Sequence, residues 1–403
     1  MRTIIFGTYD TAMHPRIATI AEGLAARGFD VTECNIPLGL TTADRVDMLA
    51  KPWKVGGLVA RLASRWLGLA ARARGLSKHG LGRPDVVVVG YLGHFDVHLA
   101  RLLYRRGKVP IVLDHLISAA NTAKDRRLDG GLKTKLLRLI DAAALRAADI
   151  VVVDTEEHLE IVPEKYRSKA VVVHVGAPAP WHEAAAELSV GTEPSGDTES
   201  SGDTESSGDT ESSGDPGGPL KVVFYGLYTP LQGTPVIGEA LGRLAGTPIE
   251  VTMIGRGQDE AETKRAAAAN QSVRWLDWVP AAELPALVAA LDVCLGIFGT
   301  GDKALRVVPN KVFQGAAAGC AVITSDTAPQ RRVLGTVSQE FGAVLVPPGD
   351  PAALADALRR LADDREALLK LRHAARQLAA ERFTPEQVVG PLTDRLVPPH
   401  AGA

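Results

Sequence analysis

The sequence predicts an α/β protein with two Rossmann-like domains, each built on a parallel sheet with helices on both faces. Short runs rich in valine and isoleucine alternate with longer amphipathic segments along the chain, which is the pattern of βαβ units. An acidic polar repeat interrupts this alternation near the middle of the chain. The 403 residues, 46% of them hydrophobic, are enough to form two sizeable cores.

The first half of the chain contains six apolar segments with the length and composition of strands. The predicted strands are residues 3–6, 30–34, 85–91, 110–113, 149–153 and 170–175. Amphipathic segments separate most of them, as expected for parallel strands joined by crossover helices. We predict that these elements form a first domain, residues 1–188.

Histidines follow two of these strands. His94 lies shortly after the third strand, and His115 lies directly after the fourth. Open α/β sheets bind ligands at the carboxyl ends of their strands, so both imidazoles are candidates for a functional site, although a lone histidine there is more often structural. Asp114 precedes His115, and neighbours on a strand point to opposite faces, so only one of the two is expected to face the site. His14 and Arg16 are either ligand-facing or ordinary turn residues.

The segment 51–83 is basic and carries two tryptophans. It holds eight Lys or Arg residues and no Asp or Glu, and Trp53 and Trp66 are interleaved with them. On a helical wheel, a basic face lies beside an apolar stripe formed by Leu58, Leu62, Trp66 and Leu69. Such a helix can lie on an anionic membrane surface, or it can pack into its own domain with a solvated basic face.

Residues 195–215 read SGDTES three times and then SGD, with seven carboxylates and no cation. Nothing apolar is present to offset the entropy of ordering, so we predict a disordered acidic linker over residues 189–218. The linker is either a repeat expansion in a tolerant connection or an anionic segment that tunes domain closure or membrane contact.

The second half again alternates strands and helices. The predicted strands are residues 220–225, 249–254, 273–279, 293–298, 321–324 and 342–346. Amphipathic helices are expected over residues 350–362 and 365–382, and the Phe-Thr-Pro sequence at 383–385 breaks the second of them. These elements predict a second domain, residues 219–384.

The loop between the strands at 293–298 and 321–324 carries three cations: Lys303, Arg306 and Lys311. A helix that begins near Asn310 would point unpaired N–H groups and the positive end of its dipole at this loop. The arrangement suits a phosphorylated ligand, although an ordinary βαβ unit with a solvated basic loop would have the same pattern.

The block PNKVFQGAAAGCAVITSD resembles the signature of retaining nucleotide-sugar glycosyltransferases of the large family four type. In that signature two glutamates stand eight residues apart, whereas this chain has Arg306 and Gln314 in those places. An amide can still bond a ribose hydroxyl, and an arginine is better suited to phosphate. The resemblance implies the glycosyltransferase B (GT-B) arrangement, in which two Rossmann-like domains face each other across a cleft and the last segment, residues 385–403, crosses back to the first domain.

The resemblance also identifies a donor-phosphate loop, Gly226 to Gly233. The family has an arginine shortly after the first glycine and a lysine before the last, where this chain has Leu227 and Gln232. Departure of a diphosphate requires compensating positive charge. The candidates to supply it are Arg256, Lys303, Arg306 and Lys311. The PLQG, GIFG and PNK blocks resemble those of a subgroup of these transferases in which the cations have been relocated.

The function implied by the resemblance is transfer of a hexose from a nucleotide diphosphate sugar to a hydroxyl of a saccharide or lipid-linked acceptor. Retention is expected, with no cofactor besides the donor and no metal, since no Asp-x-Asp pair stands at a strand end. His115 would face the transferred sugar, with His94 as the second candidate. A nucleotide-sugar epimerase on the same fold and a catalytically idle, transferase-like scaffold are the alternatives.

Composition excludes several other classes. The net charge of −2 and the absence of a nucleic-acid motif argue against nucleic-acid binding. Cys34, Cys294 and Cys320 are too few for a disulfide framework. The first ten residues lack the apolar segment of a signal peptide, and no apolar run is long enough to span a bilayer. We therefore expect a cytoplasmic protein, with peripheral contact at the inner membrane face through residues 51–83.

Overall fold

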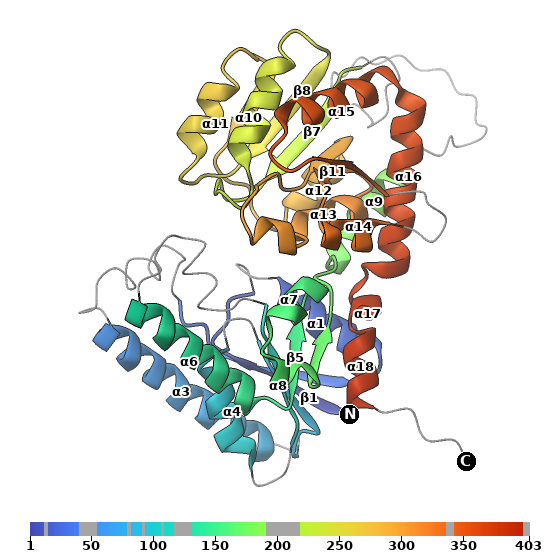
Figure 1. The fold of residues 1–403 in the computed structure, drawn as a ribbon. Helices are drawn as coiled ribbons and strands as arrows, with labels where there is room; N and C mark the ends of the chain where they lie inside the picture. The colour runs from blue at the N-terminus through green and yellow to red at the C-terminus, as the bar shows by residue number, and fades with distance from the viewer. Residues whose placement is uncertain are drawn as a thin grey trace, which may run out of the picture. The chain divides into compact units, whose positions relative to one another are not determined.

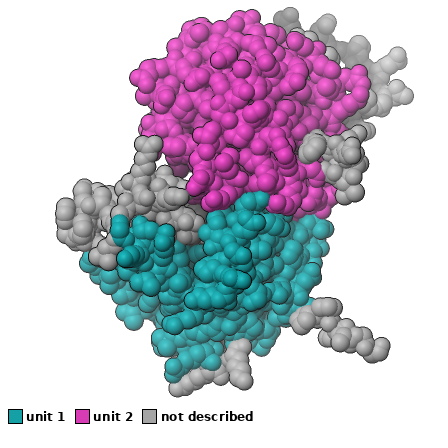
Figure 2. Space-filling model, viewed as in Figure 1, with its two compact units in different colours: residues 1–176, 385–403 teal, residues 177–384 magenta. Residues whose placement is uncertain are grey.

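The computed structural model describes residues 1–11, 15–39, 55–78, 82–90, 93–105, 109–116, 131–190, 218–335 and 342–397. The chain divides into two compact units, coloured separately in Figure 2: Met1–Gly176 with Pro385–Ala403, and Ala177–Thr384. Each unit contains a six-stranded sheet whose strands all pair in parallel. The predicted fold class, two Rossmann-like α/β units, is confirmed, and the acidic repeat at 195–215 lies outside the described residues.

The sheet of the first unit has the strand order β2-β1-β3-β4-β5-β6, and Figure 1 labels its strands β1 and β5. Its strands are β1 (Arg2–Gly7), β2 (Asp30–Asn35), β3 (Val86–Val89), β4 (Ile111–Asp114), β5 (Ile150–Val153) and β6 (Ala170–Val172). Phe6 and Ile5 belong to different hydrophobic clusters, because successive side chains of β1 point to opposite faces. The sheet is therefore buried on both faces, which explains its continuous valine and isoleucine runs.

Helices cover both faces of this sheet. They are α1 (Arg16–Ala26), α3 (Val55–Lys78), α4 (Asp96–Tyr104), α6 (Gly131–Ala147), α7 (Glu156–Ile161), α8 (Glu164–Arg167), α17 (Pro385–Val388) and α18 (Gly390–Leu396). α17 packs against α1, so the end of the chain contributes to the core of the first unit. No helix in the described ranges has a stretch that is long and apolar enough to cross a bilayer.

The sheet of the second unit has the order β12-β11-β10-β7-β8-β9. Its strands are β7 (Leu220–Tyr225), β8 (Ile249–Ile254), β9 (Val273–Leu276), β10 (Val293–Leu295), β11 (Ala321–Ser325) and β12 (Ala343–Val346). Its helices are α9 (Ala179–Val190), α10 (Thr234–Arg243), α11 (Glu260–Ala266), α12 (Leu284–Ala289), α13 (Asn310–Ala317), α14 (Ala328–Leu334), α15 (Pro351–Asp363) and α16 (Arg365–Arg382), with a 3₁₀ turn at Ala304–Arg306. β7 and β10 lie at the centre, so their carboxyl ends are flanked by strands on both sides.

Helix α9 belongs to the second unit, which corrects the boundary that the sequence predicts at residue 188. The division falls after Gly176, because α9 packs against α12 and α13. The indole of Trp181, 6% exposed, stacks on Tyr225 of β7 with ring centroids 5.7 Å apart. The segment is short and alanine-rich, and its sequence alone did not reveal this partner.

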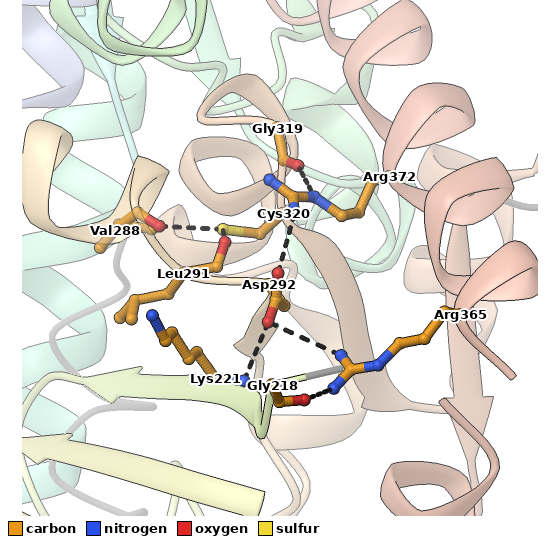
Figure 3. A network of polar contacts seen from close by, with 9 residues as sticks. All are labelled: Gly218, Lys221, Val288, Leu291, Asp292, Gly319, Cys320, Arg365 and Arg372. Atoms are coloured by element: carbon orange, nitrogen blue, oxygen red, sulfur yellow. Dashed lines mark hydrogen bonds and ion pairs between the residues drawn. The ribbon is translucent and has the colours of Figure 1, made fainter. Parts of the chain in front are cut away.

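A polar network joins helix α16 to the sheet of the second unit (Figure 3). Asp292, at the start of β10, accepts a hydrogen bond from the Lys221 backbone N–H at 2.9 Å and one from the Arg372 guanidinium at 2.8 Å. Arg365 lies 4.0 Å from the same carboxylate, and Arg372 also donates to the Gly319 carbonyl at 2.9 Å. One nearly buried carboxylate thus connects two strands with the long helix.

Candidate functional site

Two turns meet backbone to backbone in the second unit, at the carboxyl ends of β7 and β10. The Phe298 N–H donates to the Gln232 carbonyl at 3.0 Å. Gly233 adopts φ 65°, and a Cβ there would stand 2.4 Å from the Gly299 nitrogen. Two features therefore require glycine at this position: its left-handed backbone conformation and the close approach of the neighbouring turn. Gly233 is also the N-cap residue of α10, so the positive end of the helix dipole lies at this junction.

The Lys311 ammonium lies at this junction. Its Nζ donates to Gln232 Oε1 at 2.6 Å and stands 3.7 Å from the centroid of the Phe224 ring. A Cβ on Gly226 would be only 3.2 Å from the same nitrogen. The structure thus brings together three of the residues predicted to hold the donor, and the lysine ammonium contacts the glutamine that stands where the family has a lysine.

Burial changes the acid–base behaviour of Lys311. The side chain comes from the first turn of α13 and the residue is 4% exposed. Desolvation lowers the pKa of Lys311 to about 7, against a smaller opposing effect of the Cys294 thiol. Among the described residues, no carboxylate pairs with this ammonium. A bound anionic ligand would therefore supply a negative charge that these residues do not.

Gln314 lies one turn further along α13. Its Oε1 accepts a hydrogen bond from the Tyr225 hydroxyl at 3.0 Å, and both side chains are buried. Tyr225 is also the residue on which Trp181 stacks. Sequence reasoning missed both aromatic residues, because a tyrosine at the end of a buried strand and a tryptophan in an alanine-rich helix carry no motif.

The other predicted cations do not join Lys311. Arg256 is exposed and forms an ion pair with Asp277, beyond the ends of β8 and β9. Lys303 is half-buried, and Arg306 is exposed at the end of the 3₁₀ turn. Of the four cations that the sequence offers for a diphosphate, Lys311 is therefore the one that the structure places inside the glycine-lined junction.

The two predicted histidines meet in the first unit. The rings of His94 and His115 are 5.2 Å apart in an edge-on arrangement, and the two residues are 7% and 8% exposed. Asp141 of α6 is equally buried, and its Oδ1 lies 3.0 Å from His94 Nε2. Burial lowers the pKa of His115 to about 4, with His94 and His158 adding to the effect and Asp141 opposing it. His115 is thus a neutral imidazole at physiological pH.

Asp114 faces away from His115, as alternation along a strand predicts. It pairs with Arg16 at 2.9 Å, and Arg16 also donates to the Val173 carbonyl at 2.8 Å. Burial raises the pKa of the Asp114 carboxyl, although Arg16 opposes that effect. Arg16 is 2% exposed, so it is a core ion-pair partner rather than a turn residue, and His14 lies outside the described residues.

Asp141 is the member of the histidine cluster that sequence reasoning missed. It is the one acidic residue of α6, and apolar residues surround it in the sequence LLRLIDAAAL. A carboxylate on the apolar side of a basic helix is a signal that could have been used, because such a group is costly to bury without a partner.

Two protein-family models match this chain. Residues 219–364 match a model described as glycosyl transferases group 1, and residues 11–176 match the glycosyl transferase 4-like domain. A phosphatidyl-myo-inositol mannosyltransferase from Mycobacterium leprae (strain TN) is 33% identical over 164 residues, which are 40% of this chain. The matched segment spans 41% of the length of that relative.

Solved structures share the fold across nearly the whole chain. A sucrose-phosphate synthase from Thermosynechococcus elongatus superposes with a TM-score of 0.65 at 14% identity, covering 98% of both chains. Anabaena HepE in complex with UDP superposes with a TM-score of 0.61 at 12% identity, also covering 98% of both chains. Each compact unit therefore matches one glycosyltransferase family model, the 4-like domain in the first unit and glycosyl transferases group 1 in the second.

Proposed function

We propose that this protein transfers a hexose from a nucleotide diphosphate sugar to a hydroxyl acceptor, with retention at the sugar carbon. The observation that carries the proposal is the Lys311 ammonium, which lies at 2.6 Å from Gln232 beside Gly226 and has no carboxylate partner among the described residues. A diphosphate bound there would receive that charge together with the positive end of the α10 dipole.

Lys311 also supports a mechanism that needs no divalent cation at the donor. As the bond from the sugar carbon to the diphosphate oxygen breaks, its electron pair stays on the diphosphate, and the growing negative charge needs a fixed positive partner. Lys311 would supply that partner. Gln314, held by Tyr225 at 3.0 Å, would supply an amide to a donor hydroxyl.

His115 is the proposed residue at the transferred sugar. A neutral imidazole can donate a hydrogen bond to a sugar hydroxyl or stabilise charge that develops on the sugar. We expect His115→Ala to lower turnover by about 10²–10⁴-fold, the usual range for loss of a positioned acid–base group, with donor affinity nearly unchanged. Steady-state kinetics together with calorimetry of the donor separate the two quantities. Normal turnover of the His115→Ala variant would show that His115 does not act at the transferred sugar.

Titration calorimetry with UDP and GDP tests the proposal as a whole. HepE, which shares the fold, was crystallised with UDP, and this makes UDP a sensible first probe. A transferase or a nucleotide-sugar epimerase should bind one of the two nucleotides. Absence of binding to either would favour the idle scaffold, and the fate of the nucleotide sugar, transferred or epimerised, distinguishes the two enzymes.

A lipid-linked acceptor at an anionic membrane surface is a second proposal, and the first unit offers a surface for it. Leu67 of α3 is 75% exposed and Leu139 of α6 is 67% exposed. Arg61 and Lys135 on the same helices are exposed as well. Both helices pack on α4. Exposed leucines beside cations are typical of surfaces that contact anionic lipid.

The apolar stripe that the sequence suggests for this contact faces inward instead. The Trp66 indole donates to Asp96 at 2.8 Å, and Leu69 is fully buried in the core of the first unit. The ends of the basic segment, residues 51–54 and 79–81, lie outside the described residues. The candidate contact therefore consists of the outward-facing leucines and cations of α3 and α6.

A paired leucine substitution tests this membrane proposal. We expect Leu67→Asp with Leu139→Asp to weaken binding to anionic vesicles at least about tenfold, because charge replaces inserted apolar surface. Vesicle flotation with anionic and zwitterionic lipids measures it. Leu369→Asp is the matched control, since Leu369 is a 60% exposed leucine of α16 in the other unit. Equal flotation of all variants would exclude this surface.

A further inference from the structure

Three side chains from three elements of the second unit form a chain of contacts. The indole of Trp181, from α9, stacks on the ring of Tyr225, the last residue of β7, with the ring planes 16° apart. The Tyr225 hydroxyl in turn donates a hydrogen bond to Gln314 Oε1 of α13 at 3.0 Å. All three residues are more than nine-tenths buried. The orientation of the Gln314 amide therefore depends on the aromatic pair behind it.

The chemistry of the phenol decides which end of the amide faces Tyr225. Burial raises the pKa of Tyr225 well above its ordinary value, so the hydroxyl keeps its proton and needs an acceptor. The Cys294 thiol also lies beside the phenol, but sulfur is a weak acceptor, and this thiol donates to the Lys311 carbonyl at 3.5 Å. The Gln314 oxygen is therefore the acceptor, and the amide nitrogen points away from Tyr225.

The nitrogen of the Gln314 amide remains open to a ligand. No described residue accepts a hydrogen bond from Nε2, and this nitrogen is not among the polar atoms that are sealed from solvent. Gln314 follows Lys311 by three positions on α13, and residues at this spacing share one face of a helix. An amide N–H on the same face as the lysine proposed to bind the diphosphate can thus donate to an oxygen of the bound donor.

The stack with Trp181 limits the motion of the phenol. A ring that is covered on one face has fewer accessible side-chain angles, and stacked pairs attract each other beyond their buried area. Helix α9 packs on α13, which carries Gln314, as well as on α12. Loss of the indole would therefore free the phenol to turn away from the amide.

We propose that Tyr225 and Trp181 are positioning residues of the donor site. Tyr225 holds the Gln314 amide with its N–H groups toward the nucleotide of the donor, and Trp181 fixes the ring of Tyr225. The inference rests on the proposed function, because it takes the bound nucleotide as the ligand. It adds a direction for the contact, from the amide N–H to a ligand oxygen, and it makes α9 a part of the donor site.

A double-substitution cycle, measured by calorimetry with UDP and GDP, tests the proposal. Tyr225→Phe removes the hydroxyl and keeps the ring that stacks on Trp181, so nucleotide affinity is expected to fall about 3–10-fold, as for the loss of one neutral hydrogen bond. Gln314→Met has a similar volume and no N–H, and it is expected to lower the affinity at least as much. In the Gln314→Met background, Tyr225→Phe and Trp181→Leu should each change the affinity by less than about 1.5-fold, because both act through the amide.

This coupling separates a positioning role from a merely structural one. If Tyr225 and Trp181 only supported the fold, their effects on affinity would be the same with and without the Gln314 amide. Tyr104→Phe is the matched control and should leave nucleotide affinity unchanged. Tyr104 belongs to α4 in the other unit, and its buried hydroxyl has no hydrogen-bond partner among the described residues. Melting temperatures show that each variant is folded.

The cycle also distinguishes failure of this inference from failure of the proposed function. If the wild type binds neither nucleotide, the proposed function fails, and the positioning role fails with it. If the wild type binds a nucleotide and Tyr225→Phe binds it equally well, the transferase proposal stands and the positioning role is overturned. The same conclusion follows if the effect of Tyr225→Phe persists in full in the Gln314→Met background.

Discussion

Lys311→Met is expected to weaken the affinity for nucleoside diphosphates by one to two orders of magnitude and, at the same time, to stabilise the protein. Methionine fills a similar volume beside Phe224 and Gly226 without a charge. The lost charge-assisted contact to phosphate should weaken binding by about 1.5–3 kcal/mol, or about 10–150-fold. The folded state is expected to become more stable, because an apolar side chain replaces a desolvated ammonium that has no carboxylate partner among the described residues.

The pH dependence of stability has a definite sign. The folded pKa of Lys311, about 7, lies below the ordinary value of 10.5, so the unfolded chain binds a proton more readily at this lysine. The free energy of unfolding of the wild type should therefore rise as the pH increases from about 7 toward 10.5. Below pH 7 the lysine is charged in both states and the full cost of its burial remains. Lys311→Met should lack this rise.

Urea titrations at several pH values and calorimetry with UDP and GDP measure both effects. The expected gain at pH 6 is a few kcal/mol, since each tenfold change in acid dissociation corresponds to about 1.4 kcal/mol. Lys264→Met is the control, because Lys264 of α11 is 41% exposed and pairs with Glu260. A destabilised Lys311→Met variant, or one with unchanged nucleotide affinity, would contradict our interpretation of this lysine.

Asp292→Ala is expected to cost about 3–5 kcal/mol of folding free energy, as for other broken buried ion pairs. The substitution leaves the Arg372 guanidinium, 17% exposed, without its carboxylate and the Lys221 N–H without its acceptor. It also removes the connection between α16 and the strands β7 and β10 (Figure 3). Denaturant unfolding measured by circular dichroism reports the loss.

The surface ion pair between Asp356 and Arg359 is the matched control for this prediction. The Asp356 side chain is 65% exposed, so Asp356→Ala should change stability by less than about 1 kcal/mol. If Asp292→Ala does not fold, Arg372→Ala provides a milder test, because Asp292 keeps its contacts with Lys221 and Arg365. Equal effects of Asp292→Ala and Asp356→Ala would show that the network does not hold the helix to the sheet.

The fold was predictable because buried parallel strands have a plain signature. β3 is four consecutive valines, and Ile249–Ile254 is bounded by a proline and a glycine. Such segments are apolar on both faces, so they can be recognised as strands without knowing which strands they pair with. The boundary near residue 188 was not predictable in this way, since α9 is assigned to a unit only through its contacts with α12 and α13.

The site was predictable in part. Lys311 and Gln232 stand in motif blocks, and the structure joins them through a contact of 2.6 Å between residues 79 positions apart. The sequence could not rank Lys311 above Arg256 or Arg306, because the burial of a lysine depends on tertiary packing. Asp141 was missed for the same reason: its partners come from other elements, and its own helix shows only an isolated carboxylate.

The elements that flank the acidic hexapeptide repeat belong to the same unit, because α9 precedes the repeat and β7 follows it within Ala177–Thr384. The covalent tethers between the units are instead the peptide bonds at Gly176–Ala177 and Thr384–Pro385. Gain or loss of SGDTES copies would therefore change the number of residues that connect α9 to β7 within the second unit. Both connections between the units would keep the same length.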